Sequence, residues 1–243
     1  MQLLTITDGL TSAFEPARKV LKPILSNPTY LAGWGVLILV CVGILWWDIR
    51  KRNRALPSMM KFVWTLVVAY SGPFGLAVYW YSGRTQISND SLWRRGFRST
   101  SHCYSGCGAG EVVGMVAIAG ALAVGSTLVQ TVGTFALAYT FGYALTMGPL
   151  MQEGESFRTA FSDAFYSETP SITIMEITAI GTDLLLAQGA KFGDPLFWGS
   201  LAFSLSVGFL FAYPVNTALV RFGVKEGMMN PKKMRDDGAQ AAD

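Results

Sequence analysis

The sequence predicts an all-α protein: a polytopic membrane helical bundle of about six transmembrane helices, with amphipathic helices at the membrane interface. Of the 243 residues, 51% are apolar and only 14% are charged, whereas a typical soluble domain has about 25% charged residues. The mean hydropathy is +0.36. The apolar residues gather in runs of roughly spanning length, separated by short polar segments. We therefore expect an integral membrane protein surrounded by the lipid bilayer.

The charges and cysteines narrow the class further. The formal net charge is only +3, and the basic residues flank the apolar runs, which favours membrane-flanking charge and argues against nucleic acid as a partner. Three cysteines do not make a secreted disulfide framework. Residues 1–30 lack the pattern of a cleavable signal, so we expect the first membrane segment to be retained.

The N-terminal segment, residues 1–29, is predicted to lie in the interface, because apolar residues recur every three or four positions with basic residues between them. Pro16 and Pro23 should divide it into two short helical pieces.

Residues 30–101 are predicted to form a two-helix membrane hairpin and a basic linker. The first helix covers 30–47 and the second about 62–81. Gly72 and Pro73 fall in the middle of the second helix and should kink it.

Residues 102–222 are predicted to be a four-helix membrane domain, followed by a polar, flexible tail at 223–243. A second amphipathic, interfacial helix is expected at 151–170, between the fourth and fifth spans. The four expected spans are 103–124, 128–150, 171–188 and 195–220.

Six spans would place both termini on one side of the membrane. Thirteen Lys and Arg residues would then lie on that side and six on the other, which favours cytoplasmic termini. The basic cluster from Arg50 to Arg54 argues against this arrangement. If that cluster is cytoplasmic, one of the first two segments is not a full span.

The stretch 101–118 contains the only histidine and two of the three cysteines. If this stretch is helical, Cys103, Cys107 and Glu111 share one face. The neighbouring row is made of small residues and predicts a packing ridge for another helix. That row is Gly106, Gly110 and Gly114.

Three donors at the head of this helix suggest a site for a soft transition metal, copper or zinc: His102, Cys103 and Cys107. Two other readings stay open: an interfacial histidine, and thiols that pack as small apolar groups. Adjacent residues point about 100° apart on a helix, so His102 and Cys103 converge only where the chain is not helical.

Three acidic residues fall inside predicted spans: Glu111, Glu176 and Asp183. The helical rise places Glu111 and Glu176 at a similar depth. A carboxylate in hydrocarbon is costly, so these groups should face protein or water, stay protonated or hold a cation. They would be functional groups or the metal's outer partners, or else form interhelical hydrogen bonds. For Asp183 a structural polar contact is an equal alternative.

Several motifs together resemble a bacterial membrane-protein family catalogued as domain of unknown function 4396. They are WWDIRKRN, MMKFVWTLVVAYSGPFGLAVYW, STSHCYSGCGAGEVVGM and DPLFWGSLAFSLSVGFLFAYPVNTALV. The resemblance covers about residues 47–220 and is most specific from 101 onward. It implies a polytopic domain in the bacterial inner (plasma) membrane, a recurrent motif at His102, Cys103, Gly106 and Cys107, and a second at Tyr213–Asn216. It implies no activity, and it favours copper slightly over zinc.

Three functions remain as hypotheses. The first is a metal-handling membrane protein that binds or passes copper. The second is a proton-coupled small transporter that uses the buried carboxylates. The third is a non-catalytic subunit or assembly factor that docks on other membrane subunits or on a second copy of the chain. An enzyme is not predicted, because the sequence has neither a Gly-x-Ser-x-Gly elbow nor a phosphate loop, and a single histidine excludes multi-histidine metal centres.

Overall fold

The computed structural model describes residues 2–187, 189–228 and 230–232, with side chains from residue 12 onward. Every regular element in these ranges is a helix, which confirms the predicted all-α membrane bundle. Five helices are long and apolar enough to cross a membrane, so six spans are not confirmed. They are α2 (Pro28–Arg52), α5 (Leu92–Met115) with the π-helical turn η1 (Val116–Ala121), α6 (Thr127–Gln152), α7 (Phe157–Ala187) and α8 (Pro195–Arg221).

The predicted second span is a hairpin of two short helices, α3 (Ser58–Ser71) and α4 (Pro73–Ser82). The chain does not kink at Gly72 but turns back there, with φ +54° and ψ −122°, a conformation that residues with side chains rarely adopt. Pro73 then starts α4 with its fixed φ. The two helices are antiparallel and close, because a Cβ on Gly75 would lie 2.6 Å from the Val67 carbonyl oxygen.

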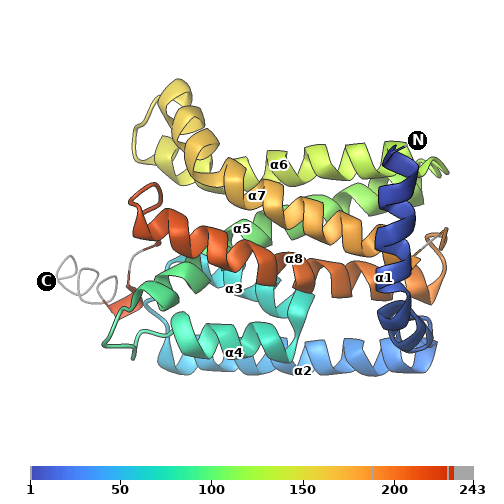
Figure 1. The fold of residues 1–243 in the computed structure, drawn as a ribbon. Helices are drawn as coiled ribbons and strands as arrows, with labels where there is room; N and C mark the ends of the chain where they lie inside the picture. The colour runs from blue at the N-terminus through green and yellow to red at the C-terminus, as the bar shows by residue number, and fades with distance from the viewer. Residues whose placement is uncertain (1, 188, 229, 233–243) are drawn as a thin grey trace, which may run out of the picture.

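The hairpin enters the membrane domain and returns to the same end (Figure 1). At 1.5 Å per residue its helices are about 21 and 15 Å long, less than the roughly 30 Å of a hydrocarbon core. Such a turn at membrane depth requires cover from neighbouring protein. Tyr104 of α5 provides some of it, since its hydroxyl lies 2.7 Å from that of Ser71, and Phe209 of α8 packs edge-on against Phe74.

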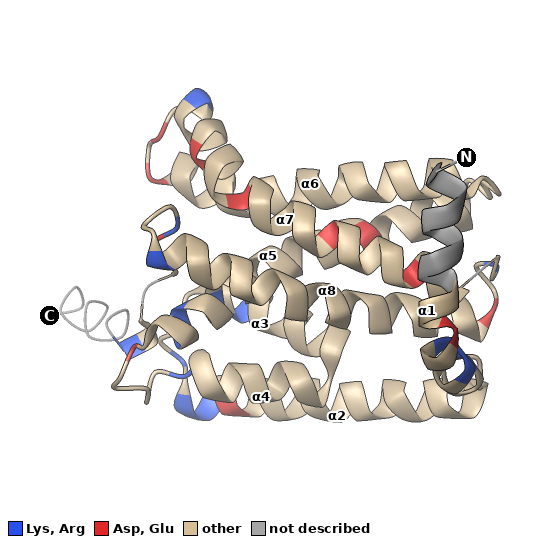
Figure 2. Cartoon of the chain, in the orientation of Figure 1, with Lys and Arg blue, Asp and Glu red and all other residues tan. Residues whose placement is uncertain are grey.

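Five crossings place the start of α2 and the end of α8 at opposite ends of the bundle (Figure 1). The expectation that both termini lie on one side depended on six crossings and is not confirmed. We call the end where α2 and α8 finish the basic end. It carries thirteen of the Lys and Arg residues in the described ranges, and the opposite end carries four (Figure 2). The thirteen are Arg50, Lys51, Arg52, Arg54, Lys61, Arg84, Arg94, Arg95, Arg98, Arg158, Arg221, Lys225 and Lys232; the four are Arg18, Lys19, Lys22 and Lys191.

Helix α1 (Gln2–Leu25) lies across the opposite end of the bundle and meets α2, α7 and α8 (Figure 1). It is one helix that contains both Pro16 and Pro23, where the sequence predicted two pieces. The side chains of its first ten residues lie outside the described part of the chain.

Two further boundaries differ from the predictions. Helix α5 begins at Leu92, eleven residues before the expected span, because Ser91 caps its first turn by accepting a hydrogen bond from the Arg94 N–H. Helix α7 joins the predicted interfacial helix and the fifth span into one element. Pro170 lies inside α7, which continues through it instead of ending there. Figure 1 shows α7 as a bent helix.

Helices α5 and α6 touch backbone to backbone along the glycine row. A Cβ on Gly106 would lie 2.7 Å from the Gly142 Cα, and one on Gly110 would lie 2.5 Å from the Ala138 Cα. Only residues without side chains allow helices to approach so closely. Cys103, Cys107 and Glu111 form the neighbouring row of α5, and Cys107 also lies near α6, because a Cβ on Gly142 would be 3.8 Å from its Sγ atom.

Candidate functional site

His102 and Cys103 point in different directions, because α5 is regular at these positions. His102 is buried and lies beside the Leu145 carbonyl of α6. Cys103 lies beside Ser171 of α7. The three predicted metal donors are therefore not gathered around one point.

The two thiols form a pair on α5. The Sγ atoms of Cys103 and Cys107 are 4.0 Å apart, and both cysteines are free and buried. Within the described ranges, no group of three or more His, Cys, Asp or Glu side chains could hold a metal ion. Two neighbouring thiols with the histidine turned away do not provide the four ligands that zinc usually takes.

Glu111 of α5 and Glu176 of α7 lie close enough to interact directly. Their exposed fractions are 3% and 0%. Oε1 of Glu111 and both carboxyl oxygens of Glu176 are buried and have no hydrogen-bond partner among the described residues. Neither residue belongs to any of the four ion pairs formed in that part of the chain. The bundle therefore contains a carboxyl pair without a basic partner.

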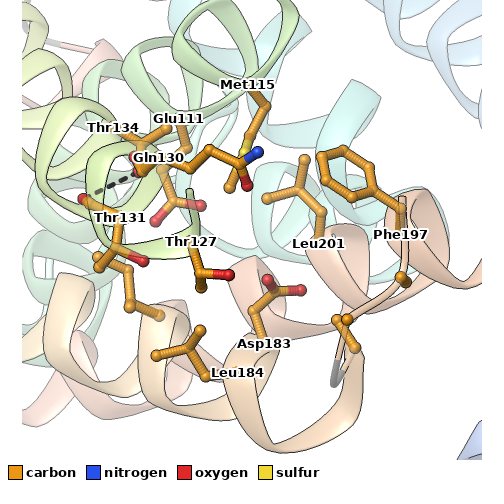
Figure 3. A pocket seen from close by; sticks show the side chains of 14 residues that line it. Glu111, Met115, Thr127, Gln130, Thr131, Thr134, Asp183, Leu184, Phe197 and Leu201 are labelled. Carbon is orange, nitrogen blue, oxygen red and sulfur yellow. Dashed lines mark hydrogen bonds between the residues drawn. The ribbon is translucent and has the colours of Figure 1, made fainter. Parts of the chain in front are cut away.

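A cavity of about 270 Å³ reaches Glu111, one member of this pair, from the opposite end of the bundle. Figure 3 shows the Glu111 and Asp183 carboxyl groups on its wall, with Gln130 and Thr127 of α6 beside them. Asp183 accepts a hydrogen bond of 2.6 Å from the Ser200 hydroxyl of α8. The remaining polar lining consists of Thr131 and Thr134. The cavity combines acidic and neutral polar groups and has no basic side chain in its lining.

A second cluster of polar side chains lies at the basic end of the same helices. Lys225, which follows α8, folds back and forms an ion pair with Glu168 of α7, with an Nζ–Oε2 distance of 2.6 Å. Lys225 also donates hydrogen bonds to the Asn216 side-chain oxygen at 2.8 Å and to the Ser171 hydroxyl at 3.3 Å. Ser99 of α5 donates to the same Asn216 oxygen. All five side chains are buried.

Together these groups form what we call the polar column. It runs between α5, α7 and α8 from the cavity to Lys225. On α5 its members recur every fourth residue, and on α7 they recur at seven or eight, so each helix offers one face to the column. The α5 members are Ser99, Cys103, Cys107 and Glu111; the α7 members are Glu168, Glu176 and Asp183.

Two charged residues at the basic end of the column were not among the residues predicted from the sequence. Glu168 was placed in an interfacial helix and Lys225 in the flexible tail, whereas both are buried against α7 and α8. Nothing in the local pattern marks Lys225. Ser99 could have been found, because it precedes Cys103 by four residues, but only if α5 had been started at Leu92.

Comparison with known proteins gives one match. The family model described as "Domain of unknown function (DUF4396)" matches residues 92–225, more than half of the chain. This range begins with α5 and ends at Lys225, so it contains the whole polar column. No curated protein and no solved structure matches the chain.

Proposed function

Because this chain belongs to the DUF4396 family, whose description names no activity, we propose its function from the site itself: the polar column is the path of a proton-coupled small transporter. Glu111 and Glu176 are the groups that take up and release the proton. The observation that carries the proposal is the carboxyl pair, buried and without a basic partner among the described residues, one member of which, Glu111, lines a cavity that also contains Asp183.

Charge balance is the first support. An ionised carboxylate in the middle of a membrane costs about 2.5–3.5 kcal/mol on insertion scales, and two at close range repel each other. A basic residue would balance this charge, but Lys225 is already paired with Glu168. A proton, or a small cation that displaces it, is then the balancing species. Exchange between the two is the elementary step of a coupled carrier.

The second support is access from one side at a time. The cavity leads from the opposite end of the bundle to Glu111. On the other side of the pair, the column narrows to Cys107 and Cys103 and ends at the Lys225–Glu168 ion pair. In the proposed cycle, the ion pair opens and gives protons and cations at the basic end access to the carboxyl pair, while the cavity at the opposite end closes.

The distribution of charge orients the cycle. We place the basic end in the cytoplasm of a bacterial inner membrane, because cytoplasmic loops carry an excess of Lys and Arg. The re-entrant α3–α4 hairpin supports this assignment, since it puts the Arg50–Arg54 cluster on the same side as the other basic loops. Helix α1 and the cavity then face the outside.

Cysteine labelling tests the orientation. Gly125→Cys, in the α5–α6 connection, should react with a membrane-impermeant maleimide added to intact cells. Glu153→Cys, at the end of α6, should react only after the cells are opened. The three native cysteines are buried and give a low background. The reverse pattern would contradict the orientation.

Proton flux tests the function. Protein reconstituted in liposomes, with Na⁺ or K⁺ supplied as the exchanging small cation, should collapse an imposed pH gradient, reported by an enclosed pH-sensitive dye, faster than empty liposomes do. Glu176→Gln and Glu111→Gln keep the side-chain shape but cannot exchange a proton, so each should abolish the protein-dependent rate. Glu153→Gln is the matched control, since Glu153 is exposed. Unchanged flux in Glu176→Gln would refute the proposal.

The other two hypotheses gain no comparable support. For copper or zinc handling, the described residues contain no group of three or more His, Cys, Asp or Glu side chains that could hold a metal ion. For a role as a subunit or assembly factor, the part of the chain that the structure describes offers no partner chemistry beyond apolar surface suited to lipid.

A further inference from the structure

The α3–α4 hairpin fills only part of the membrane depth between α2 and α8. A groove of about 590 Å³ lies beyond its tip, toward the opposite end of the bundle. Ser71 and Phe74 of the hairpin tip form its inner end, Trp34 and Leu37 of α2 one wall, and Phe203 of α8 the other. The volume lies within the range of about 300–1,000 Å³ typical of small-molecule sites.

The apolar lining of the groove suits a hydrocarbon chain. Its lining is apolar apart from a few groups, and among these the Ser71 hydroxyl is already bound to Tyr104. At the opposite end of the bundle the groove is bordered by Ile24 and Leu25, the last turn of α1. Gly199 of α8 lets this turn rest on the bundle, because a Cβ there would lie 2.5 Å from the Leu25 carbonyl oxygen.

A basic cluster on α1 stands next to this mouth. Lys19 and Lys22 are exposed and form no ion pair with any described residue. Arg18 pairs loosely with Glu15, at 3.5 Å, and its Nε atom is buried without a hydrogen-bond partner. The cluster lies about one turn of helix from Ile24 and Leu25, the distance between a phospholipid's headgroup and the start of its chains.

We propose that this groove, with the basic cluster of α1, binds one anionic phospholipid. The phosphate lies against Arg18, Lys19 and Lys22, and one acyl chain lies between α2 and α8 on the tip of the hairpin. Charge complementarity selects the anionic headgroup, because each nearby Lys or Arg attracts anionic lipid. The bound chain completes the half of the membrane domain that the hairpin leaves open. This inference does not depend on the proposed transport function.

Two glycines of α2 provide a matched pair of variants for the chain-binding part. No atom lies within 4 Å of a Cβ built on Gly33 or on Gly43, so a leucine fits at both. Gly33 lines the groove and Gly43 does not. Native mass spectrometry of the purified full chain, titrated with phosphatidylglycerol, should show one bound lipid for the wild type and for Gly43→Leu. Gly33→Leu should weaken this binding about tenfold, since each methylene kept out of the groove lowers affinity about fourfold.

The same titration with phosphatidylcholine tests the headgroup. Wild type should prefer phosphatidylglycerol, and Lys19→Gln with Lys22→Gln should lower that affinity about fivefold per lysine while phosphatidylcholine binding stays unchanged. Equal phosphatidylglycerol binding by Gly33→Leu and Gly43→Leu would refute the proposal that the acyl chain lies in the groove. Equal affinity of the wild type for both lipids would refute the proposal that the basic cluster binds the headgroup. A wild-type dimer that Gly33→Leu converts to a monomer would show that a second copy, not a lipid, occupies the groove.

Discussion

Replacing Lys225 by methionine tests whether the basic end of the polar column is held by a buried ion pair. Both side chains of the Lys225–Glu168 pair are 6% exposed and lie 2.6 Å apart. With an effective dielectric constant of about 20, their attraction is about 6 kcal/mol. Removing two ions from water costs several kcal/mol each, so the intact pair contributes little net stability.

The single variant behaves differently from the pair. Lys225→Met leaves the Glu168 carboxylate buried without its partner, and the Asn216 oxygen loses a charged donor. We expect the free energy of unfolding to fall by about 3–5 kcal/mol. Adding Glu168→Leu removes the stranded charge and should restore most of the loss. The measurement is reversible unfolding in mixed dodecyl maltoside and sodium dodecyl sulfate, followed by circular dichroism.

The control is Glu15→Gln, which breaks the half-exposed Glu15–Arg18 pair of 3.5 Å and should cost less than about 1 kcal/mol. If the double variant is as unstable as Lys225→Met alone, the stability at this end comes from packing of the lysine stem and not from charge. A loss below about 1 kcal/mol in Lys225→Met would likewise refute the reasoning.

Two further predictions concern the face and the head of α5. Gly110→Ala places a Cβ 2.5 Å from the Ala138 backbone, so it should force α5 and α6 apart and lower the free energy of unfolding by about 1–3 kcal/mol. The control is Gly148→Ala, whose Cβ meets open space. In a thermal unfolding assay this control should melt at about the same temperature as the wild type. The triple variant His102→Ala, Cys103→Ser, Cys107→Ser should contain no less copper or zinc than the wild type by elemental analysis, because the three side chains do not converge; stoichiometric metal in the wild type alone would reverse this conclusion.

The sequence predicted the crossing helices well, because hydrophobic length alone identifies them. It failed at α3–α4, since a 20-residue apolar run reads the same whether the chain crosses the membrane or returns at Gly72. The only indication was the Arg50–Arg54 cluster, which lay on the wrong side in a six-span arrangement. The prediction of where α5 begins was wrong for a related reason. Arg98 looked like a linker residue, but it is buried and paired with Asp90 at 2.6 Å.

For the candidate site, helical spacing predicted that Glu111 shares a face with the cysteines, and the rise per residue predicted that it lies at the depth of Glu176. Spacing along one helix could not predict the position of Lys225, because this residue follows α8 and the chain turns back there to place it at the column. The metal hypothesis stays a prediction. Adjacent residues on a regular helix diverge, and among the described residues His102 and the two thiols do not form a group that could hold a metal ion.

The α3–α4 hairpin also constrains the order of events during biosynthesis. Its turn at Gly72 is covered by Tyr104 and Phe209, residues that the ribosome adds about 30 and 140 positions later. Until α5 and α8 are in place, the polar backbone of the turn would face bare lipid, which membranes do not tolerate. The newly made hairpin must therefore wait at the membrane surface or within the insertion machinery, and it enters the bundle as one of the last steps of assembly.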